Sequence, residues 1–350
     1  MSWRYWLLAF VPVAVAAELL HAPPLAIFLL SALAIVPLSA LLGTATEELA
    51  GHAGPTIGGL LNATLGNLAE LIIAVLALRA GLVDLVKASI TGSILGNLLL
   101  VLGAAQLVGG LRYRVQKFNP HLAGMNIALL VIAAVGLIVP ALFHGAHPDP
   151  ARVQTVRMSE FVSVFLIIGY GLSLLYSMGT HRAIFGEGGA VAAGEEEPSW
   201  SLRTTLIVLA VVAAAIGFMS ELLVGATEAA SRALGLSEMF VGLVVVPIIG
   251  NAAEHSSAVL MALKNRMDLA VGIAIGSSVQ VALLVAPLLV LVGAILGKPM
   301  DLAFTTFEVA SVALAVWIAA VIAFDAESNW LEGAFLIIVY GILAVAFFFF

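Results

Sequence analysis

The 350-residue chain contains no cysteine and few charged residues. Without cysteine it has no disulfide, no thiol nucleophile and no thiolate ligand for a soft metal, so oxygen atoms are its abundant ligands. Charged residues make up 10% of the sequence, against about 25% in a soluble domain. By contrast, 62% of the residues are hydrophobic and the mean hydropathy is +1.15. This composition is that of a membrane protein and leaves no segment for a soluble catalytic domain.

The sequence also lacks the motifs of nucleic-acid binding and of catalysis. The net charge is −7 and no basic tract occurs, which argues against a nucleic-acid partner. No apolar stretch carries a His-x-x-x-His pair, and the Gly-x-Ser-x-Gly motif of serine hydrolases is absent. We therefore expect neither an enzyme nor a bound cofactor.

Long apolar stretches bounded by charge, proline or glycine fill most of the chain. Each can form a membrane-spanning helix of about 20 residues, which predicts an all-α polytopic membrane protein with about eleven transmembrane helices. The first stretch resembles a secretory signal with small residues at Ala14-Val15-Ala16, but Glu18 and His21 suit the interface where a retained span ends. The eleven stretches are residues 4–20, 24–46, 56–79, 84–110, 118–144, 157–179, 202–230, 238–263, 268–297, 301–324 and 330–350.

One polar motif occurs twice within these apolar stretches. Gly66-Asn67-Leu68-Ala69-Glu70 and Gly250-Asn251-Ala252-Ala253-Glu254 lie 184 residues apart, and Gly92-Ser93 repeats with the same offset as Gly276-Ser277. The offset pairs helices two to six with helices seven to eleven. Because five is odd, the second copy must enter the membrane from the opposite side, which is the inverted repeat of many secondary transporters.

The repeat divides the chain into a first helix and two halves. We assign residues 1–22 to an N-terminal helix, 24–180 to the first five-helix repeat and 201–350 to the second. Residues 181–200 form an acidic connector that contains Glu195, Glu196 and Glu197. A cytoplasmic N-terminus would place eight of the 14 basic residues, and the connector, in the cytoplasm, which favours that orientation.

The spacing of the repeated residues predicts their depth in the membrane. The midpoint between Glu70 and Ser93 is the pair Gly81-Leu82, and the midpoint between Glu254 and Ser277 is Asn265-Arg266. If each midpoint is the turn of a helical hairpin, each polar group lies about 12 residues, or roughly 17 Å, from its turn. That distance is about half of a 30 Å hydrocarbon core, so both carboxylates lie near the midplane.

Carboxylates at this depth need a cation, a proton or an ion-pair partner. No lysine or arginine lies at matching depth, so we predict a site in which two carboxylates and neutral oxygens bind a hard cation such as Ca²⁺. Without the cation, burial favours the protonated carboxyl groups, so Ca²⁺ and H⁺ compete. The alternative is that these side chains only pack helices together. The predicted ligands are Glu70, Glu254, Asn67, Asn251, Ser93, Ser277, Gln280 and Asn97.

Glycine and proline weaken the helices that carry the repeated motif. Gly58, Gly59 and Gly66 precede Glu70, and Pro247 and Gly250 precede Glu254. Pro247 has no N–H for the carbonyl of Leu243, and a free carbonyl at the midplane is tolerated where it lines a cavity or binds a cation. We therefore expect both helices to be broken near the site.

Other polar residues suggest an entry path and regulation. Glu47 and Glu228 lie in a second repeated motif near helix ends, where they form either a gate or solvated interfacial groups, and Glu221 lies two turns inside Glu228. His255 points about 100° away from Glu254 on a helix, so it is either a proton relay or a core histidine. The three connector glutamates form a solvated linker or a weak Ca²⁺ sensor.

At these residues the sequence resembles the Ca²⁺/H⁺ antiporters, the cation/proton exchanger family of the cation/Ca²⁺ exchanger superfamily. The resemblance implies a cation site at Glu70 and Glu254, a peripheral first helix and a connector that takes part in cytosolic Ca²⁺ sensing or gating. Gln280 and Asn97 stand where sodium/calcium exchangers carry further acidic residues, which favours protons over sodium. The matching segments are Gly43–Glu48, Pro55–Thr64, Gly66–Leu71, Gly92–Asn97, Val246–His255 and Gly276–Gln280.

We therefore expect a secondary transporter that exchanges Ca²⁺ for H⁺ by alternating access in a lipid bilayer, in a prokaryotic plasma membrane with its N-terminus in the cytoplasm. A Na⁺-coupled exchanger, a Mn²⁺-selective exchanger and a cation channel are the alternatives. Inverted repeats with one enclosed site favour an exchanger over a channel. Association of the chain with further copies of itself is left open.

Overall fold

The computed structural model describes residues 3–147, 149, 151–181, 184 and 198–350. The described chain is almost entirely helical and separates into two compact units. Unit 1 takes the described parts of residues 1–92, 193–254 and 346–350, and unit 2 takes those of 93–192 and 255–345. Each unit therefore contains segments of both sequence repeats. The division of the sequence into halves at 24–180 and 201–350 stays a prediction about the repeat.

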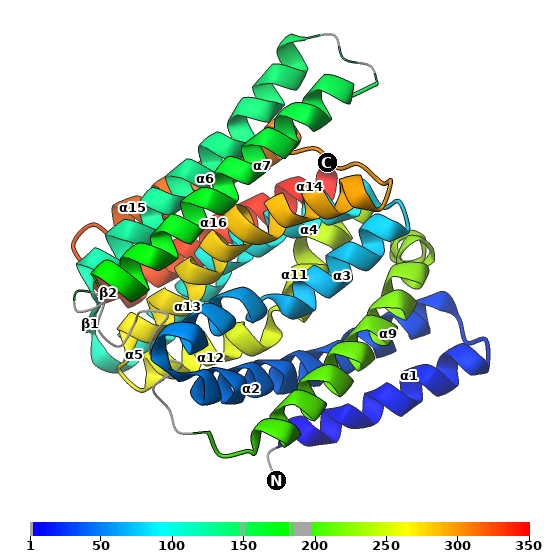
Figure 1. Ribbon diagram of the computed structural model, residues 1–350, viewed down its shortest axis with the longest axis horizontal. Coiled ribbons are helices and arrows are strands. Elements are labelled where there is room, and N and C mark those ends of the chain that lie inside the picture. The colour runs from blue at the N-terminus through cyan, green and yellow to red at the C-terminus, as the bar shows by residue number, and fades with distance from the viewer. Residues whose placement is uncertain (1–2, 148, 150, 182–183, 185–197) are drawn as a thin grey trace. The chain divides into compact units, whose positions relative to one another are not determined.

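Unit 1 is built around α2 (Pro24–Leu65) and α9 (Leu202–Leu234), which pack along each other (Figure 1). The side chain of Ser201 caps α9 at its start, and Gly235 in the left-handed region ends it. The first helix, α1, packs on α2 and buries Ala14 in the same apolar core. The other elements are η1 (Trp3–Ala9), α1 (Phe10–Leu19), α3 (Leu68–Arg79), the start of α4 (Val83–Leu95), α10 (Glu238–Phe240), η6 (Val241–Val245), α11 (Val246–Gly250) and the start of α12 (Ala252–Leu263).

Unit 2 contains the paired helices α6 (Pro120–Ala146) and α7 (Val153–Leu174), which lie side by side in Figure 1. On α7 the buried side chains include Ser159 and Ser163, whereas Phe161 and Phe165 are 70% and 72% exposed. Polar groups inside and apolar groups outside are the pattern of a helix in lipid. The remaining elements are η2 (Gly96–Val101), α5 (Leu102–Tyr113), β1 (Val115–Lys117), η3 (Leu175–Thr180), α13 (Met267–Gln280), η7 (Val281–Val285), α14 (Ala286–Ile295), α15 (Thr306–Ile322), β2 (Glu327–Asn329) and most of α16 (Trp330–Phe349).

Each predicted apolar stretch contains helix in the structure. Seven described segments are single helices long and apolar enough to span a membrane, and two more are bent pairs: Ile57–Leu65 with Leu68–Arg79, and Glu238–Gly250 with Ala252–Leu263. Trp6–Leu19 and Thr306–Ile322 are apolar but shorter. The multi-pass helical architecture is confirmed, while the count of eleven spans stays a prediction.

Two short strands depart from the predicted all-helical fold. β1 and β2 pair antiparallel, with Gln116 opposite Ser328, and both come from loops between predicted helices. Neither loop has the alternating pattern of a strand, so only the contact between them provides the backbone partners. Lys117 and Glu327 on these strands form an ion pair at 3.0 Å. The sheet holds two loops at the same end of unit 2.

The two predicted hairpin turns occur where the sequence placed them. α3 and α4 are joined at Gly81, with φ 85°, and α12 and α13 at Asn265, with φ 60°. In each turn the next N–H bonds back to the helix, from Leu82 to Ala77 and from Arg266 to Met261. These are the bonds of a helix that ends on a left-handed residue.

Candidate cation site

Both helices that carry the repeated motif are broken at its asparagine. Asn67 has φ −95° and ψ 24°, and Asn251 has φ −92° and ψ 6°, values that lie between helix and extended chain. The helix axis bends by 41° at the first break and by 61° at the second. The expected breaks are therefore present, directly after Gly66 and Gly250, and each glutamate lies in the first turn of the helix that follows.

In unit 1 the side chain of Glu70 reaches the second break. A Cβ built on Gly250 would lie 3.4 Å from Cγ and 3.8 Å from Cδ of Glu70, which is van der Waals contact. Glu70 is buried, and Glu254 is half-buried and within electrostatic range of it. Two carboxylates that are far apart in sequence therefore meet beside a broken helix.

The two asparagines of the motif are also buried in unit 1. Asn67 is 2% exposed and Asn251 1%, and the Asn251 side chain donates to the carbonyl of Pro247 at 3.1 Å. An amide that donates with its nitrogen has its oxygen available as an acceptor or a cation ligand. The structure thus brings Glu70 and Glu254 together in unit 1 and places the motif asparagines at the two breaks.

The other predicted ligands lie in unit 2, next to two π-helical segments. Asn97 belongs to η2, and its Nδ2 donates to Oγ of Ser277 on α13 at 3.0 Å. Gln280 is the last residue of α13 and precedes η7, and Ser93 is buried in α4. π-Helical segments within longer helices are often found at functional sites. A single shell made from all eight residues stays a prediction.

No group of three or more His, Asp or Glu side chains forms a metal site among the described residues. The predicted site is of another kind, because it has two carboxylates and takes its remaining oxygens from amides and hydroxyls. Such a donor set suits an ion that is bound and released as cargo.

The carbonyl of Leu243, which lacks a donor at Pro247, does not face open space. It packs against Gly92 of α4, where an added Cβ would lie 1.9 Å from the oxygen. This carbonyl therefore takes part in a close backbone contact, and a role for it at a cavity or a cation site stays a prediction. Gly276, the repeat counterpart of Gly92, has no such neighbour within 4 Å of an added Cβ.

A buried lysine was absent from the predicted set. Lys87 is 5% exposed and lies on α4, six residues before Ser93, where the second repeat has Val271. The sequence has no signal for its burial. The lysine makes the two repeats electrostatically different.

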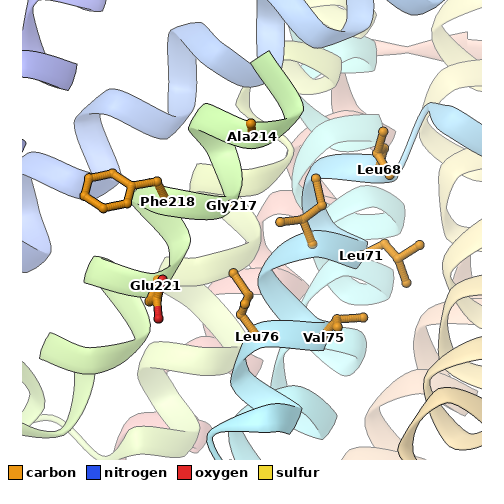
Figure 2. A pocket seen from close by; sticks show the side chains of 9 residues that line it. Leu68, Leu71, Val75, Leu76, Ala214, Gly217, Phe218 and Glu221 are labelled. Carbon is orange, nitrogen blue, oxygen red and sulfur yellow. The ribbon is translucent and has the colours of Figure 1, made fainter. Parts of the chain in front are cut away.

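The predicted gate residues occupy exposed positions in unit 1. Glu47 is exposed on α2, and Glu228 pairs with Arg232 one turn along α9. Glu221 lies on α9 beside an open groove of about 380 Å³, whose other lining residues are apolar and include Leu68 and Leu76 of α3 (Figure 2). Leu68, which lines the groove, is the residue that follows Asn67, and the gate role stays a prediction.

The end of the connector contacts α2. Glu48 accepts hydrogen bonds from the Ser199 hydroxyl and, at 2.9 Å, from the Trp200 N–H, and Nε2 of His52 lies 2.9 Å from the Trp200 carbonyl oxygen. The sequence offered no reason to prefer Glu48 over its neighbour Glu47. The predicted sensor residues Glu195, Glu196 and Glu197 lie outside the described residues.

His255 is half-buried on α12, and its Nε2 has no hydrogen-bond partner among the described residues. The alternative of a core histidine with both ring nitrogens satisfied is therefore not supported. The proton-relay role stays a prediction.

Comparison with known proteins identifies the family. The family model described as sodium/calcium exchanger protein matches residues 23–179 and 204–349. The chain belongs to this family. It is 44% identical to a Ca²⁺/H⁺ antiporter of Aphanothece halophytica, over 99% of this chain and 96% of that protein. It is 42% identical to the Ca²⁺/H⁺ antiporter ChaA of Bacillus subtilis, over 80% of this chain and 79% of that protein.

Solved structures show the same fold. Native YfkE matches with a TM-score of 0.86 and 38% sequence identity, covering 99% of this chain and 100% of that chain. The H⁺/Ca²⁺ exchanger CAX matches with a TM-score of 0.77 over 99% of this chain and 91% of that chain, and at 18% identity this likeness concerns the fold alone. The chain is therefore a multi-pass membrane protein with the exchanger fold.

Proposed function

We propose that this member of the exchanger family exchanges Ca²⁺ for H⁺ across a membrane by alternating access. The observation that carries the proposal is the position of Glu70 against Gly250, which brings Glu70 beside Glu254 at the break of the repeat-related helix. The names of the relatives from Aphanothece halophytica and Bacillus subtilis support the same pair of ions. Glu70 and Glu254 are the shared acceptors for both.

Charge balance couples the two fluxes. Two ionised carboxylates neutralise one Ca²⁺, and protonation neutralises the same carboxylates when Ca²⁺ leaves. The empty, doubly ionised site has no such compensation, and a buried uncompensated charge costs several kcal/mol in hydrocarbon. If the transporter reorients only with a neutral site, Ca²⁺ can cross in one direction only when protons cross in the other.

The amide and hydroxyl oxygens complete the cation shell in this proposal. Asn67 and Asn251 act from the two helix breaks, and Ser93, Asn97, Ser277 and Gln280 from the helices that carry the π segments. Neutral ligands leave the charge of the site at −2, which matches a divalent ion better than two additional carboxylates would. Protons are the counter-ion because no further acidic group takes part.

Ca²⁺ uptake into proteoliposomes tests the function. The purified chain is reconstituted with an acidic lumen, with a Na⁺-loaded lumen at equal pH, or with no gradient, and the membrane potential is clamped with K⁺ and valinomycin. We expect saturable Ca²⁺ uptake with the acidic lumen alone. Uptake driven equally by Na⁺ would support the Na⁺-coupled alternative, and non-saturating uptake without a counter-gradient would support a channel. Competition by Mn²⁺ measures the cation preference.

Orientation in a prokaryotic plasma membrane is part of the proposal. Because the chain has no cysteine, single cysteines can be introduced at two exposed loop residues, Lys264 and Lys298. With a cytoplasmic N-terminus, an impermeant thiol reagent added to intact cells should label Lys298→Cys and spare Lys264→Cys. The reverse pattern would invert the proposed topology.

A further inference from the structure

The carboxyl end of α12 is bound by side chains from the end of α5 and from β1. Nε2 of Gln116 donates to the carbonyl of Ala262 at 2.9 Å and to Oδ1 of Asn265 at 3.0 Å. The hydroxyl of Tyr113 donates to the carbonyl of Leu263 at 2.9 Å. All of these residues lie in unit 2. The last carbonyls of a helix have no donor within it, so these side chains provide bonds that the helix lacks.

The orientation of Gln116 is determined by its surroundings. The side chain is 2% exposed, and the carbonyl of Ala262 can only accept, so the amide nitrogen must face it. Oε1 lies against Gly109, where an added Cβ would be only 2.0 Å away. The pairing of β1 with β2 places Gln116 opposite Ser328 and orders the strand that carries it. Gln116 is thus a rigid donor aimed at the end of α12.

The same helix carries Glu254 near its other end. Glu254 lies eight residues before Ala262, a distance of about 12 Å along an unbroken helix that runs from Ala252 to Leu263. Immediately before the helix is the break at Asn251, where the chain bends by 61°. The bonds from Gln116 and Tyr113 therefore lie at the end of α12 that is opposite to the bend.

We propose that Gln116 is a positioning residue for cation exchange, which sets the depth and rotation of Glu254 through the bonds to Ala262 and Asn265. The inference rests on the proposed exchange of Ca²⁺ for H⁺ at Glu254. It gives the β1–β2 sheet a role in transport, because pairing with β2 orders β1, and Gln116 on β1 binds the end of α12. Among the described residues, no side-chain hydrogen bond of this kind reaches the turn at Gly81, which corresponds to Asn265 in the first repeat.

The variant Gln116→Glu tests the proposal with almost no change in shape. An ionised carboxylate has only acceptors, so the bond to the carbonyl of Ala262, which can only accept, is lost. We expect the apparent KM for Ca²⁺ to rise at least about fivefold, as for the loss of a buried hydrogen bond. Acidification should restore part of the uptake relative to wild type, because protonated Glu can donate one bond. The variant Gln116→Leu should show no such recovery.

Val115→Glu is the matched control. Val115 is on the same strand and 50% exposed, so this variant adds a carboxylate one residue away without facing α12. Its KM and pH profile should equal those of wild type. A merely structural role of Gln116 predicts instead that Gln116→Glu and Gln116→Leu lower the amount of folded protein equally and leave KM unchanged in the folded fraction, and that result would overturn the proposal.

Hydrogen–deuterium exchange of residues 262–268 separates this inference from the proposed function. Faster exchange in Gln116→Glu shows that α12 has been released, whether or not the wild type transports Ca²⁺. Released α12 with unchanged KM overturns the positioning role, whereas a wild type that fails to exchange Ca²⁺ for H⁺ refutes the proposed function instead. If Gln116→Glu does not fold, Tyr113→Phe takes its place: a raised KM supports the role, and an unchanged KM overturns it.

Discussion

The hairpins of the two repeats, residues 57–95 and 238–281, follow the same course but are held at different points. Both break at an asparagine and turn on a left-handed residue, Gly81 or Asn265. The two hairpins meet in a backbone contact between Gly92 of the first and Leu243 of the second, whereas Gly276, the counterpart of Gly92, has no such contact. The second is bound at its turn by Gln116. Equivalent carboxylates are thus supported by non-equivalent neighbours.

This difference has a physical consequence for the two glutamates. Glu70 is buried in unit 1, where the backbone contact between the two hairpins also lies. Glu254 is half-buried on a helix whose far end is anchored in unit 2. The repeat duplicates the chemical groups, whereas the mechanical support of each group depends on the segments that pack around it.

Substitution of the glutamates should have the largest effect. Glu70→Gln and Glu254→Gln each remove a negative charge and a proton acceptor, so we expect pH-driven Ca²⁺ uptake to fall on the order of 100-fold in both, a loss of about 2.8 kcal/mol. Glu238→Gln, at an exposed position, serves as the control. If one glutamate variant kept normal uptake in proteoliposomes, the two carboxylates would not form one shared site.

Substitution of the repeat-related glycines Gly92 and Gly276 by alanine should change the stability of the protein by different amounts. In Gly92→Ala the new methyl group meets the carbonyl of Leu243, so part of the backbone must move and the protein should lose about 1–3 kcal/mol. Gly276→Ala meets nothing within 4 Å and should be neutral or stabilising by up to about 1 kcal/mol. Thermal unfolding in detergent measures both. Equal losses would contradict the observed difference in packing.

Substitution of the left-handed residues in the two turns, Gly81 and Asn265, should change the unfolding free energy by different amounts. Gly81→Ala forces a side chain to adopt φ 85° and should cost about 1–2 kcal/mol. Asn265→Gly relieves the same strain but loses the bond from Gln116, so we expect a change below about 1 kcal/mol. The thermal unfolding midpoints of both variants measure these changes. A larger loss of stability in Asn265→Gly than in Gly81→Ala would mean that the bond from Gln116 contributes more than the backbone strain costs.

Helix caps in equivalent loops should differ in pH dependence. Asp149 accepts hydrogen bonds from the N–H and the hydroxyl of Thr155, at 2.8 and 2.9 Å, and these bonds hold the pKa of its carboxyl below the usual value. Its counterpart Asn329 accepts from two N–H groups of α16 and has no charge. A depressed pKa contributes stability above the unfolded pKa, and the contribution is lost as the pH falls through the folded pKa.

The expected result is a small, pH-dependent shift of the unfolding midpoint. At neutral pH, Asp149→Asn should unfold at a lower temperature than wild type, and the difference should shrink as the pH falls below the usual aspartate pKa of about 4. Asn329→Ala should lower the midpoint by the same amount at neutral and at acidic pH. A pH-independent effect of Asp149→Asn would show that its charge does not contribute to the cap.

Much of the candidate site was readable from local sequence. The break before Glu70 follows from Gly66, and the turn at Gly81 from the spacing of polar residues, since a 30 Å membrane constrains helix length. Burial of Lys87, contact of Gly92 with Leu243 and support by Gln116 were not predictable. Each of these features depends on a contact with a residue more than 100 positions away, or on which face of a helix packs against other helices. The hydrophobic periodicity of the sequence does not specify such contacts.

The sequence by itself determined that this protein crosses the membrane many times and carries one carboxylate motif twice. These properties follow from composition and spacing, because lipid imposes the same length and hydropathy on every span. Tertiary structure decided which segments form each compact unit, that Glu70 lies against Gly250, and that Gln116 holds α12. Apolar helices of similar length can pack in many ways, so close contacts at glycines and buried hydrogen bonds select among them.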